Sequence, residues 1–306
     1  MSWLLNHMKK WEGVFTIMLN PFRKDGEVDR NAMRQSIDFV INHGVHGLVF
    51  LGSTGEFPYI QMKDKKTIVD TAVDVTNGRL PVIIGSSAFG LEDVLELSQY
   101  SQNAGADGLM IAVPIYYQLS TESIINHYKT IASKIDLPIL LYNFPATTHW
   151  EMTPDIVIQL AEIDKVVGIK ESIRDLKQVE TVIKGVTKPF STFVGGSVYL
   201  LEALKMGGAG AADPLANLLP EYVVAVYNAF RGGDMREAEE AKKKLDSLRS
   251  ITASASNAVH AAIKEGMKAR GISMESIVKS PLPQLTERQK EDIQKKVKAA
   301  GLMNTV

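Results

Sequence analysis

Residues 166–172 read Val-Val-Gly-Ile-Lys-Glu-Ser, a run that begins as a buried strand and ends in charged residues. A short apolar run with β-branched residues, preceded here by the polar Glu162 and Asp164, is typical of a strand. Lys170 stands at the carboxyl end of that strand. Its ammonium group must either reach water or stay in a pocket that lowers its pKa. An unprotonated lysine condenses with ketones to a Schiff base, so the strand alone leaves two interpretations open, a solvated lysine and a nucleophile.

Apolar runs of the same kind recur at steps of roughly 20–35 residues, within the range that ~250 residues in eight βα units would give. Besides the lysine-bearing run, they cover residues 13–19, 47–51, 81–85, 108–113, 138–143, 192–196 and 210–212. Helical patterns separate them, from about Asp29 after the first run and over residues 172–184 after the sixth. Strands that are apolar throughout and alternate with helices indicate a parallel sheet covered by helices. The prediction is an α/β fold, a closed (β/α)8 TIM barrel over residues 13–214. A doubly wound open sheet is the alternative, which the lack of a glycine-rich dinucleotide-binding motif after the first strand disfavours.

The two ends of the chain differ from this pattern. Beyond Pro214, the sequence has helical patterns at residues 222–230, 235–249, 255–270 and 286–299, with no strand between them. They predict a C-terminal all-α extension over residues 215–306 that packs against the barrel. Residues 1–12 form an N-terminal segment whose apolar part is too short, and whose charge order is reversed, for a signal peptide.

Composition excludes several classes of function. The 306 residues carry a net charge of −1, so nothing indicates attraction to nucleic acid or to anionic membranes. Cysteine is absent, which excludes disulfides, thiolate metal sites and a cysteine nucleophile. No run approaches the ~20 apolar residues that a membrane helix needs. The six histidines show no paired ligand spacing, and no metal site is expected. A cytoplasmic protein is the default expectation.

Two other strand ends carry reactive or binding groups. TIM barrels place their active sites at the carboxyl ends of the strands. Tyr142 ends the fifth strand, beside Lys170, and residues 53–56 (Ser-Thr-Gly-Glu) follow the second. Singly, a tyrosine there can be a core residue and such a run can be a turn. Together with Lys170 they fit a 2-keto acid that is held by its carboxylate through hydroxyl and backbone N–H groups, with its ketone captured by the lysine.

Three motifs in this order carry a resemblance to a known family. They are Gly52-Ser53-Thr54-Gly55-Glu56, Tyr142-Asn143-Phe144-Pro145 and Gly168-Ile169-Lys170-Glu171. On these motifs the chain resembles the dihydrodipicolinate synthase / N-acetylneuraminate lyase family over nearly its whole length. The resemblance implies a class I lyase, a homotetramer (a dimer of dimers), that forms a Schiff base with pyruvate or a pyruvate-derived 2-keto acid. It implies no metal and no organic cofactor.

The resemblance also implies the catalytic roles. Lys170 would form the imine and Tyr142 would be the general acid and base. Ser53 matches a hydroxyl that relays protons with that tyrosine. Tyr117, the second residue of the pair Tyr116-Tyr117, would complete the relay from the neighbouring subunit, although an aromatic residue at a subunit interface would look the same in sequence.

Substrate-binding roles follow in the same way. Thr54, with Gly55 in the same turn, would hold the pyruvyl carboxylate by its hydroxyl and backbone N–H groups. Gly195 matches a glycine on the pocket floor after the seventh strand. Ala212 matches a residue whose backbone carbonyl faces the lysine.

Thr147 marks a departure from the dihydrodipicolinate synthases. Those enzymes carry an arginine two residues past the proline, which grips the carboxylate of the aldehyde substrate, and this chain has Thr147 there. A hydroxyl cannot make the bidentate charged contact of an arginine. Its loss typically costs a few kcal/mol, or on the order of 10²-fold in affinity. The sequence therefore predicts poor condensation of pyruvate with aspartate semialdehyde, unless another arginine such as Arg174 reaches in.

The leading interpretation is aldol cleavage or condensation of a 2-keto-3-deoxy sugar acid. Dihydrodipicolinate synthase itself and a dehydratase or deaminase of the same family share the imine and stay open. A non-catalytic barrel that binds a keto acid is the alternative from a different class. His149, close after the fifth strand, is a further candidate for contact with the substrate.

Overall fold

The computed structural model describes residues 11–305, and its centre is a closed barrel of parallel strands. The strands are β1 (Gly13–Ile17), β2 (Gly47–Phe50), β3 (Val82–Gly85), β4 (Gly108–Ala112), β5 (Ile139–Asn143), β6 (Val166–Glu171), β7 (Ser191–Val194) and β8 (Gly210–Asp213). Each strand pairs with the next in sequence, and β8 pairs with β1 to close the ring. This order confirms the predicted (β/α)8 TIM barrel and excludes the open sheet.

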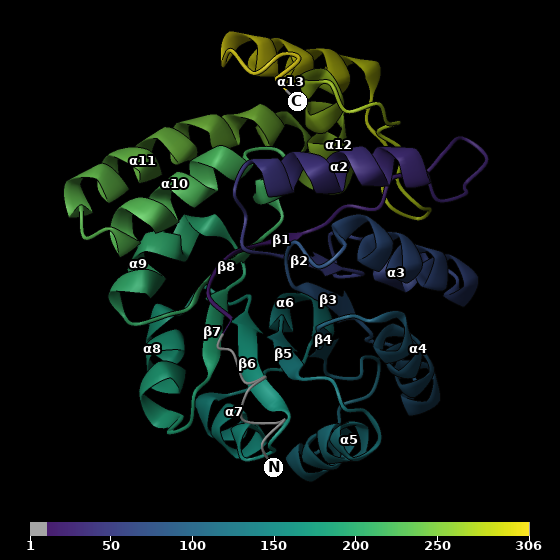
Figure 1. Ribbon diagram of the computed structural model, residues 1–306, viewed down its shortest axis with the longest axis vertical. Coiled ribbons are helices and arrows are strands. Elements are labelled where there is room, and N and C mark those ends of the chain that lie inside the picture. The colour runs from purple at the N-terminus through teal and green to yellow at the C-terminus, as the bar shows by residue number, and fades with distance from the viewer. Residues whose placement is uncertain (1–10, 306) are drawn as a thin grey trace.

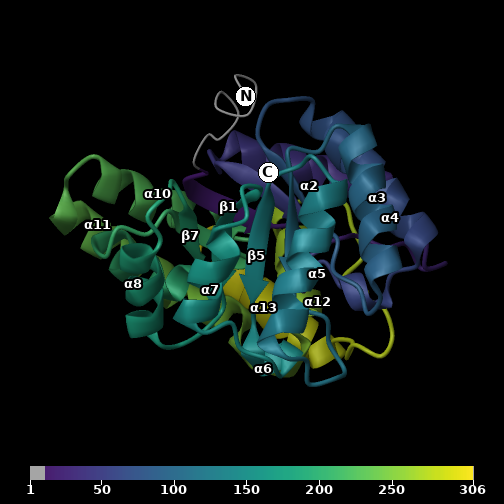
Figure 2. The same cartoon turned by 90° about the horizontal axis from the view of Figure 1, so that it is seen from below.

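Helices surround the barrel, one after each strand (Figure 1). They are α2 (Arg30–Asn42), α3 (Met62–Thr76), α4 (Leu91–Ala104), α5 (Thr121–Lys134), α7 (Pro154–Ala161), α8 (Leu176–Gly185), α9 (Leu200–Lys205) and α10 (Pro220–Arg231). Figure 2 shows β5 flanked by α5 and α7. The last of these helices, α10, packs against α9 and β1, so a helix from beyond residue 214 completes the ring.

Side-chain caps fix where several helices begin. Asp29 accepts hydrogen bonds from the backbone N–H groups of Asn31 and Ala32, as expected for the N-cap of α2. The predicted start of the helix after β6 at residue 172 was wrong. Asp175 accepts from the N–H of Lys177 and caps α8, which starts only at Leu176. Residues 172–175 are therefore a loop at the mouth of the barrel.

Three more helices complete the C-terminal part. They are α11 (Met235–Leu248), α12 (Val259–Arg270) and α13 (Glu287–Ala299). The predicted helix over residues 255–270 was wrong at its start, because residues 249–258 form 3-10 turns with non-helical backbone angles at Ala255. Figure 1 shows α13 at the rim of the molecule, beyond α2 and α12. The extension as a unit of residues 215–306 stays a prediction, as does the N-terminal segment 1–12, of which residues 1–10 lie outside the described residues.

The core has two layers, because successive side chains of a strand point to opposite faces. One layer fills the barrel and includes Phe15, Ile17 and Phe193. The other lies between strands and helices and includes Val14, Leu48 and Ile169. A filled interior leaves the carboxyl ends of the strands as the place for a site. Within the described residues, every helix is too short or too polar to cross a membrane.

Candidate active site

Lys170 lies at the barrel mouth, on β6 next to β5. Its side chain is buried, with the residue only 3% exposed, and Tyr142 is its register partner on β5. The Lys170 Nζ atom lies 4.2 Å from the centroid of the Tyr142 ring. Adjacent parallel strands thus bring the amine and the phenol together, out of bulk water, as the chemistry predicted from the sequence requires.

A hydroxyl from the second strand end joins them. Ser53 Oγ lies 3.2 Å from the hydroxyl oxygen of Tyr142, within hydrogen-bond distance. Phe144 stacks on the Tyr142 ring, with ring centroids 5.9 Å apart and planes inclined by 26°. The phenol is therefore fixed between an aromatic ring and a hydroxyl, in a position to exchange a proton with Ser53.

One cavity of about 960 Å³ contains most of the predicted residues. Its lining includes Ser53, Thr54, Tyr142, Thr147, Lys170 and Gly195. It is much larger than a molecule of the size of pyruvate needs, so a longer substrate fits beside the amine. Much of the lining is apolar or aromatic and includes Phe57, Tyr59, Phe89 and Tyr199.

Besides His149, three predicted residues lie outside the described lining of this cavity. The Gly55 carbonyl accepts a hydrogen bond from Asn20 Nδ2 at 2.6 Å, which holds this part of the loop in place. Ala212 is buried inside the barrel near Phe193. Tyr117 is 74% exposed and packs edge to face on Tyr116. An exposed tyrosine pair is consistent with a contact to another subunit, and the role of Tyr117 stays a prediction.

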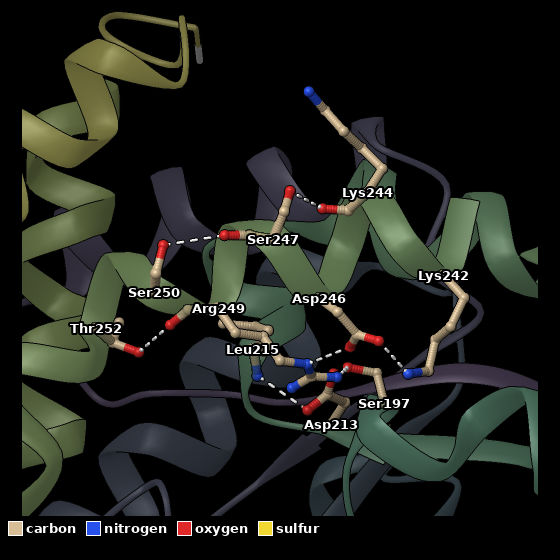
Figure 3. Close-up of polar contacts among 10 residues, drawn as sticks. All are labelled: Ser197, Asp213, Leu215, Lys242, Lys244, Asp246, Ser247, Arg249, Ser250 and Thr252. Carbon is tan, nitrogen blue, oxygen red and sulfur yellow. Dashed lines mark hydrogen bonds and ion pairs between the residues drawn. The ribbon is translucent and has the colours of Figure 1, made fainter. Parts of the chain in front are cut away.

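Gly195 has its place for a steric reason. Its N–H donates to the carbonyl of Glu171 at 2.7 Å, and a side chain there would collide with Ser172. The loop after Gly195 is held from the C-terminal part, as Figure 3 shows: Arg249 Nη2 donates to Ser197 Oγ at 2.8 Å, while its Nε bonds Asp246 Oδ1 at 2.9 Å. The helical region beyond the barrel thus holds the loop that directly follows Gly195.

The comparisons with known proteins decide the family. The model of the dihydrodipicolinate synthetase family matches residues 10–300. The chain belongs to this family. It is therefore an enzyme, a lyase of the dihydrodipicolinate synthetase family, and the resemblance found in the three motifs is confirmed.

Similar family members include aldolases and synthases. The probable 2-dehydro-3-deoxy-D-pentonate aldolase YjhH of Escherichia coli (strain K12) is 35% identical over 300 residues, covering 97% of this chain and 99% of that protein. A 4-hydroxy-tetrahydrodipicolinate synthase of Maridesulfovibrio salexigens is 30% identical over 294 residues, covering 96% and 99%. The crystal structure of YagE, a prophage protein from E. coli K12 in complex with pyruvate, matches with a TM-score of 0.90 and 31% identity, covering 95% of this chain and 99% of that one.

In this family member, Glu171 is a buried acid next to the proposed nucleophile. Asn143 Nδ2 donates to its Oε2 at 2.9 Å, while Oε1 has no hydrogen-bond partner among the described residues. Burial raises the pKa of Glu171 to about 8, and the hydrogen bond from Asn143 opposes that rise. Asn143 also bonds the backbone of Met152 through both its amide atoms, so the network ties the ends of β5 and β6 to the segment that follows the short helix α6 (Pro145–Thr148).

The raised pKa of Glu171 predicts a loss of stability at alkaline pH. Its ordinary pKa is 4.5, so between pH 4.5 and 8 the folded protein holds a proton that the unfolded chain has released. The free energy of unfolding therefore falls as pH rises from 4.5 and levels off above pH 8. At about 1.4 kcal/mol per pKa unit, the loss is at most ~5 kcal/mol.

Glu171→Gln should remove this dependence, because a glutamine is neutral at every pH. We expect the variant and the natural protein to unfold at similar denaturant concentrations at pH 5, and the variant to be the more stable one at pH 9. The exposed Glu162→Gln variant serves as control and should follow the natural protein throughout. Parallel stability curves for Glu171→Gln and the natural protein would contradict the buried, protonated acid.

Two further charged or titratable residues line the cavity: His260, which the sequence patterns did not single out, and Arg174, which they named as an arginine that could reach in. His260, on α12, lines the cavity, and burial lowers its pKa. Arg174, in the loop before α8, also lines it and is exposed. His149 is exposed and lies outside the described lining. In the part of the chain that the structure describes, no three His, Asp or Glu side chains are grouped so that they could hold a metal ion.

Proposed function

We propose that this protein is a Schiff-base aldolase that cleaves a 2-keto-3-deoxy sugar acid into pyruvate and an aldehyde. The observation that carries the proposal is the buried Lys170 amine 4.2 Å from the Tyr142 ring, with Ser53 on the phenol. The name of YjhH, a probable 2-dehydro-3-deoxy-D-pentonate aldolase, supports this substrate class, and the pyruvate complex of YagE supports a keto acid.

The cleavage begins with the amine. Lys170 Nζ attacks the C2 ketone, and Tyr142 gives its phenol proton to the hydroxyl that leaves as water, so the iminium ion and the Tyr142 phenolate form together. Tyr142, as the phenolate, takes the proton of the C4 hydroxyl, and the C3–C4 bond breaks. The bonding electrons pass to the iminium, which becomes an enamine, and the aldehyde leaves. Tyr142 then returns a proton to C3, and water hydrolyses the imine to release pyruvate and the free amine.

Thr54 and Ser53 support two parts of this reaction, the binding of the substrate and the transfer of protons. Thr54 is buried at the cavity wall, where its hydroxyl and backbone N–H can hold the substrate carboxylate. Ser53 passes protons to and from Tyr142 over the 3.2 Å contact. Tyr117 of a neighbouring subunit would complete the relay, in a homotetramer built as a dimer of dimers. The proposed reaction uses no metal and no organic cofactor. The protein would act in the cytoplasm and would bind neither nucleic acid nor a membrane.

Thr147 separates this proposal from the synthase reaction. Thr147 lies on α6 (Pro145–Thr148) and lines the cavity at the position where the synthases would have an arginine. A threonine can hydrogen-bond a hydroxylated chain and offers no charge to a second carboxylate. Arg174 also lines the cavity and keeps the synthase as the second candidate, because its guanidinium could bind that carboxylate.

A substrate panel tests the proposal. We expect pyruvate release from keto-deoxy sugar acids, and condensation of pyruvate with aspartate semialdehyde about 10²-fold weaker in kcat/KM, since the charged contact is missing. Release of a keto acid without a free aldehyde would favour the dehydratase instead. Efficient consumption of aspartate semialdehyde would favour the synthase. In that case we expect the Arg174→Ala variant to lose the ability to consume aspartate semialdehyde.

A further inference from the structure

A buried ion pair connects the C-terminal part to the loop after β2. Lys264 Nζ on α12 lies 2.5 Å from Glu56 Oε1, and both side chains are 0% exposed. Glu56 is the last residue of the Ser-Thr-Gly-Glu run, two positions after Thr54. The ion pair thus joins two residues that are 208 positions apart, and one of them belongs to the loop proposed to bind the substrate carboxylate.

Hydrogen bonds fix this pair on both sides. Lys264 Nζ also donates to the carbonyl of Ile277 at 2.8 Å. The second carboxylate oxygen of Glu56, Oε2, accepts from the backbone N–H of Lys279 at 2.7 Å. Lys264 and Lys279 both lie over the ring of Phe22, with Nζ at 4.8 and 4.5 Å from its centroid. Each carboxylate oxygen has a partner, so Glu56 has one well-defined position.

The backbone of the loop needs such an anchor. Leu51 and Glu56 bracket it, and both have left-handed backbone angles, with φ of 56° and 62°. Residues other than glycine adopt this region at a cost and keep it only where their surroundings fix it. Asn20 Nδ2 fixes one side of the turn, at the Gly55 carbonyl, and the ion pair fixes the other. Both anchors directly follow Thr54 in the chain, and the Glu56 N–H donates to the Ser53 carbonyl at 3.0 Å, so the turn that contains Thr54 closes at Glu56.

Stability alone gives a weak reason for this pair. Moving two charges out of water costs several kcal/mol each, and apolar side chains of similar size are often at least as stabilising as a buried pair. Burial lowers the pKa of Lys264, while the Glu56 carboxylate acts in the opposite direction. What an apolar pair could not supply is a directed contact that holds Glu56 at a single position.

We propose that Glu56 and Lys264 are positioning residues that hold Thr54 in the geometry that binds the substrate carboxylate. The inference rests on the proposed function, in which the Thr54 hydroxyl and N–H hold that carboxylate. It assigns to α12, a helix outside the strand ends, a role in substrate affinity. Neither side chain needs to touch the reacting atoms.

Three variants test this role: Lys264→Met, Glu56→Gln and the double variant. The readouts are the pyruvate concentration that gives half-maximal borohydride-trapped adduct on Lys170, and the temperature of unfolding. Each single variant should raise the half-saturating concentration by up to about 10²-fold, because a misplacement near 1 Å can cost that much. In the double variant no charge is left unpaired, so the unfolding temperature should recover while the half-saturating concentration stays raised. If a single variant does not fold, the double variant carries the test.

Arg270→Met is the matched control, because Arg270 lies on the same helix and in a similar pair. It is 1% exposed, and its Nη2 lies 2.8 Å from Glu221 Oε1 on α10, which anchors α12 to the ring of helices. This variant should unfold at a lower temperature and bind pyruvate as the natural protein does.

Two results would overturn the inference. One is a double variant that regains both stability and normal pyruvate saturation, which would make the pair purely structural. The other is an Arg270→Met variant that shifts saturation as far as Lys264→Met does. A natural protein that forms no adduct at saturating pyruvate would overturn the proposed function instead, and the inference with it.

Discussion

Replacing Lys170 by alanine is expected to abolish pyruvate release, with a fall in kcat/KM on the order of 10⁶-fold, because an enzyme without its nucleophile loses most of its rate enhancement. The reason lies in the mechanism proposed here: without the amine there is no iminium ion to accept the electrons of the C3–C4 bond. Mass spectrometry after borohydride treatment with pyruvate should show an adduct on Lys170 in the natural protein and none in the variant.

Lys177→Ala is the control for this experiment. Lys177 is an exposed lysine in the first turn of α8, a few residues further along the chain. Its loss should change neither the adduct nor the rate. If Lys170→Ala still releases pyruvate at the natural rate, or if the adduct maps to another lysine, the buried amine of β6 is not the nucleophile. A natural protein that binds keto acid but never turns it over would indicate the non-catalytic barrel.

Much of the fold could be predicted from the sequence because each barrel strand has a recognisable local sequence pattern. Each is an apolar run with a helix pattern behind it, and eight in order leave few ways to close a sheet. The same logic placed Lys170 and Tyr142 side by side, since neighbouring strands end at the same rim of the barrel. Local errors arose where a single side chain sets a boundary, as Asp175 does for α8.

The rest of the site depends on contacts that no local pattern contains. His260 and Lys264 lie on α12, where a helical pattern says nothing about which face meets the barrel. Glu56 was visible as part of a motif, but its buried partner is 208 residues away. Tyr117 remains a prediction for a different reason: its proposed role needs a second subunit. Strand ends alone therefore predict the reactive groups better than they predict the residues that hold them in position.

Tyr142→Phe should separate proton transfer from imine formation. The variant keeps the ring over the Lys170 amine and its stacking on Phe144, but it loses the hydroxyl that meets Ser53 at 3.2 Å. General acid–base catalysis contributes typically 10²–10⁴-fold, so we expect kcat to fall by that amount. The KM should change little, because the carboxylate contacts at Thr54 remain. Pyruvate should still be trapped on Lys170 by borohydride, at a lower rate.

Tyr128→Phe provides the matched control for the loss of a buried phenol. Tyr128 is fully buried on α5, and its hydroxyl donates to the carbonyl of Ile111 at 2.9 Å, away from the cavity lining. Its variant should lose about 1 kcal/mol of stability, the usual contribution of one hydrogen bond, and keep its activity. A Tyr142→Phe protein with natural kcat would leave the amine without a proton partner on β5. The acid and base would then have to be sought among the remaining cavity groups, such as the imidazole of His260 and the carboxyl group of Glu171.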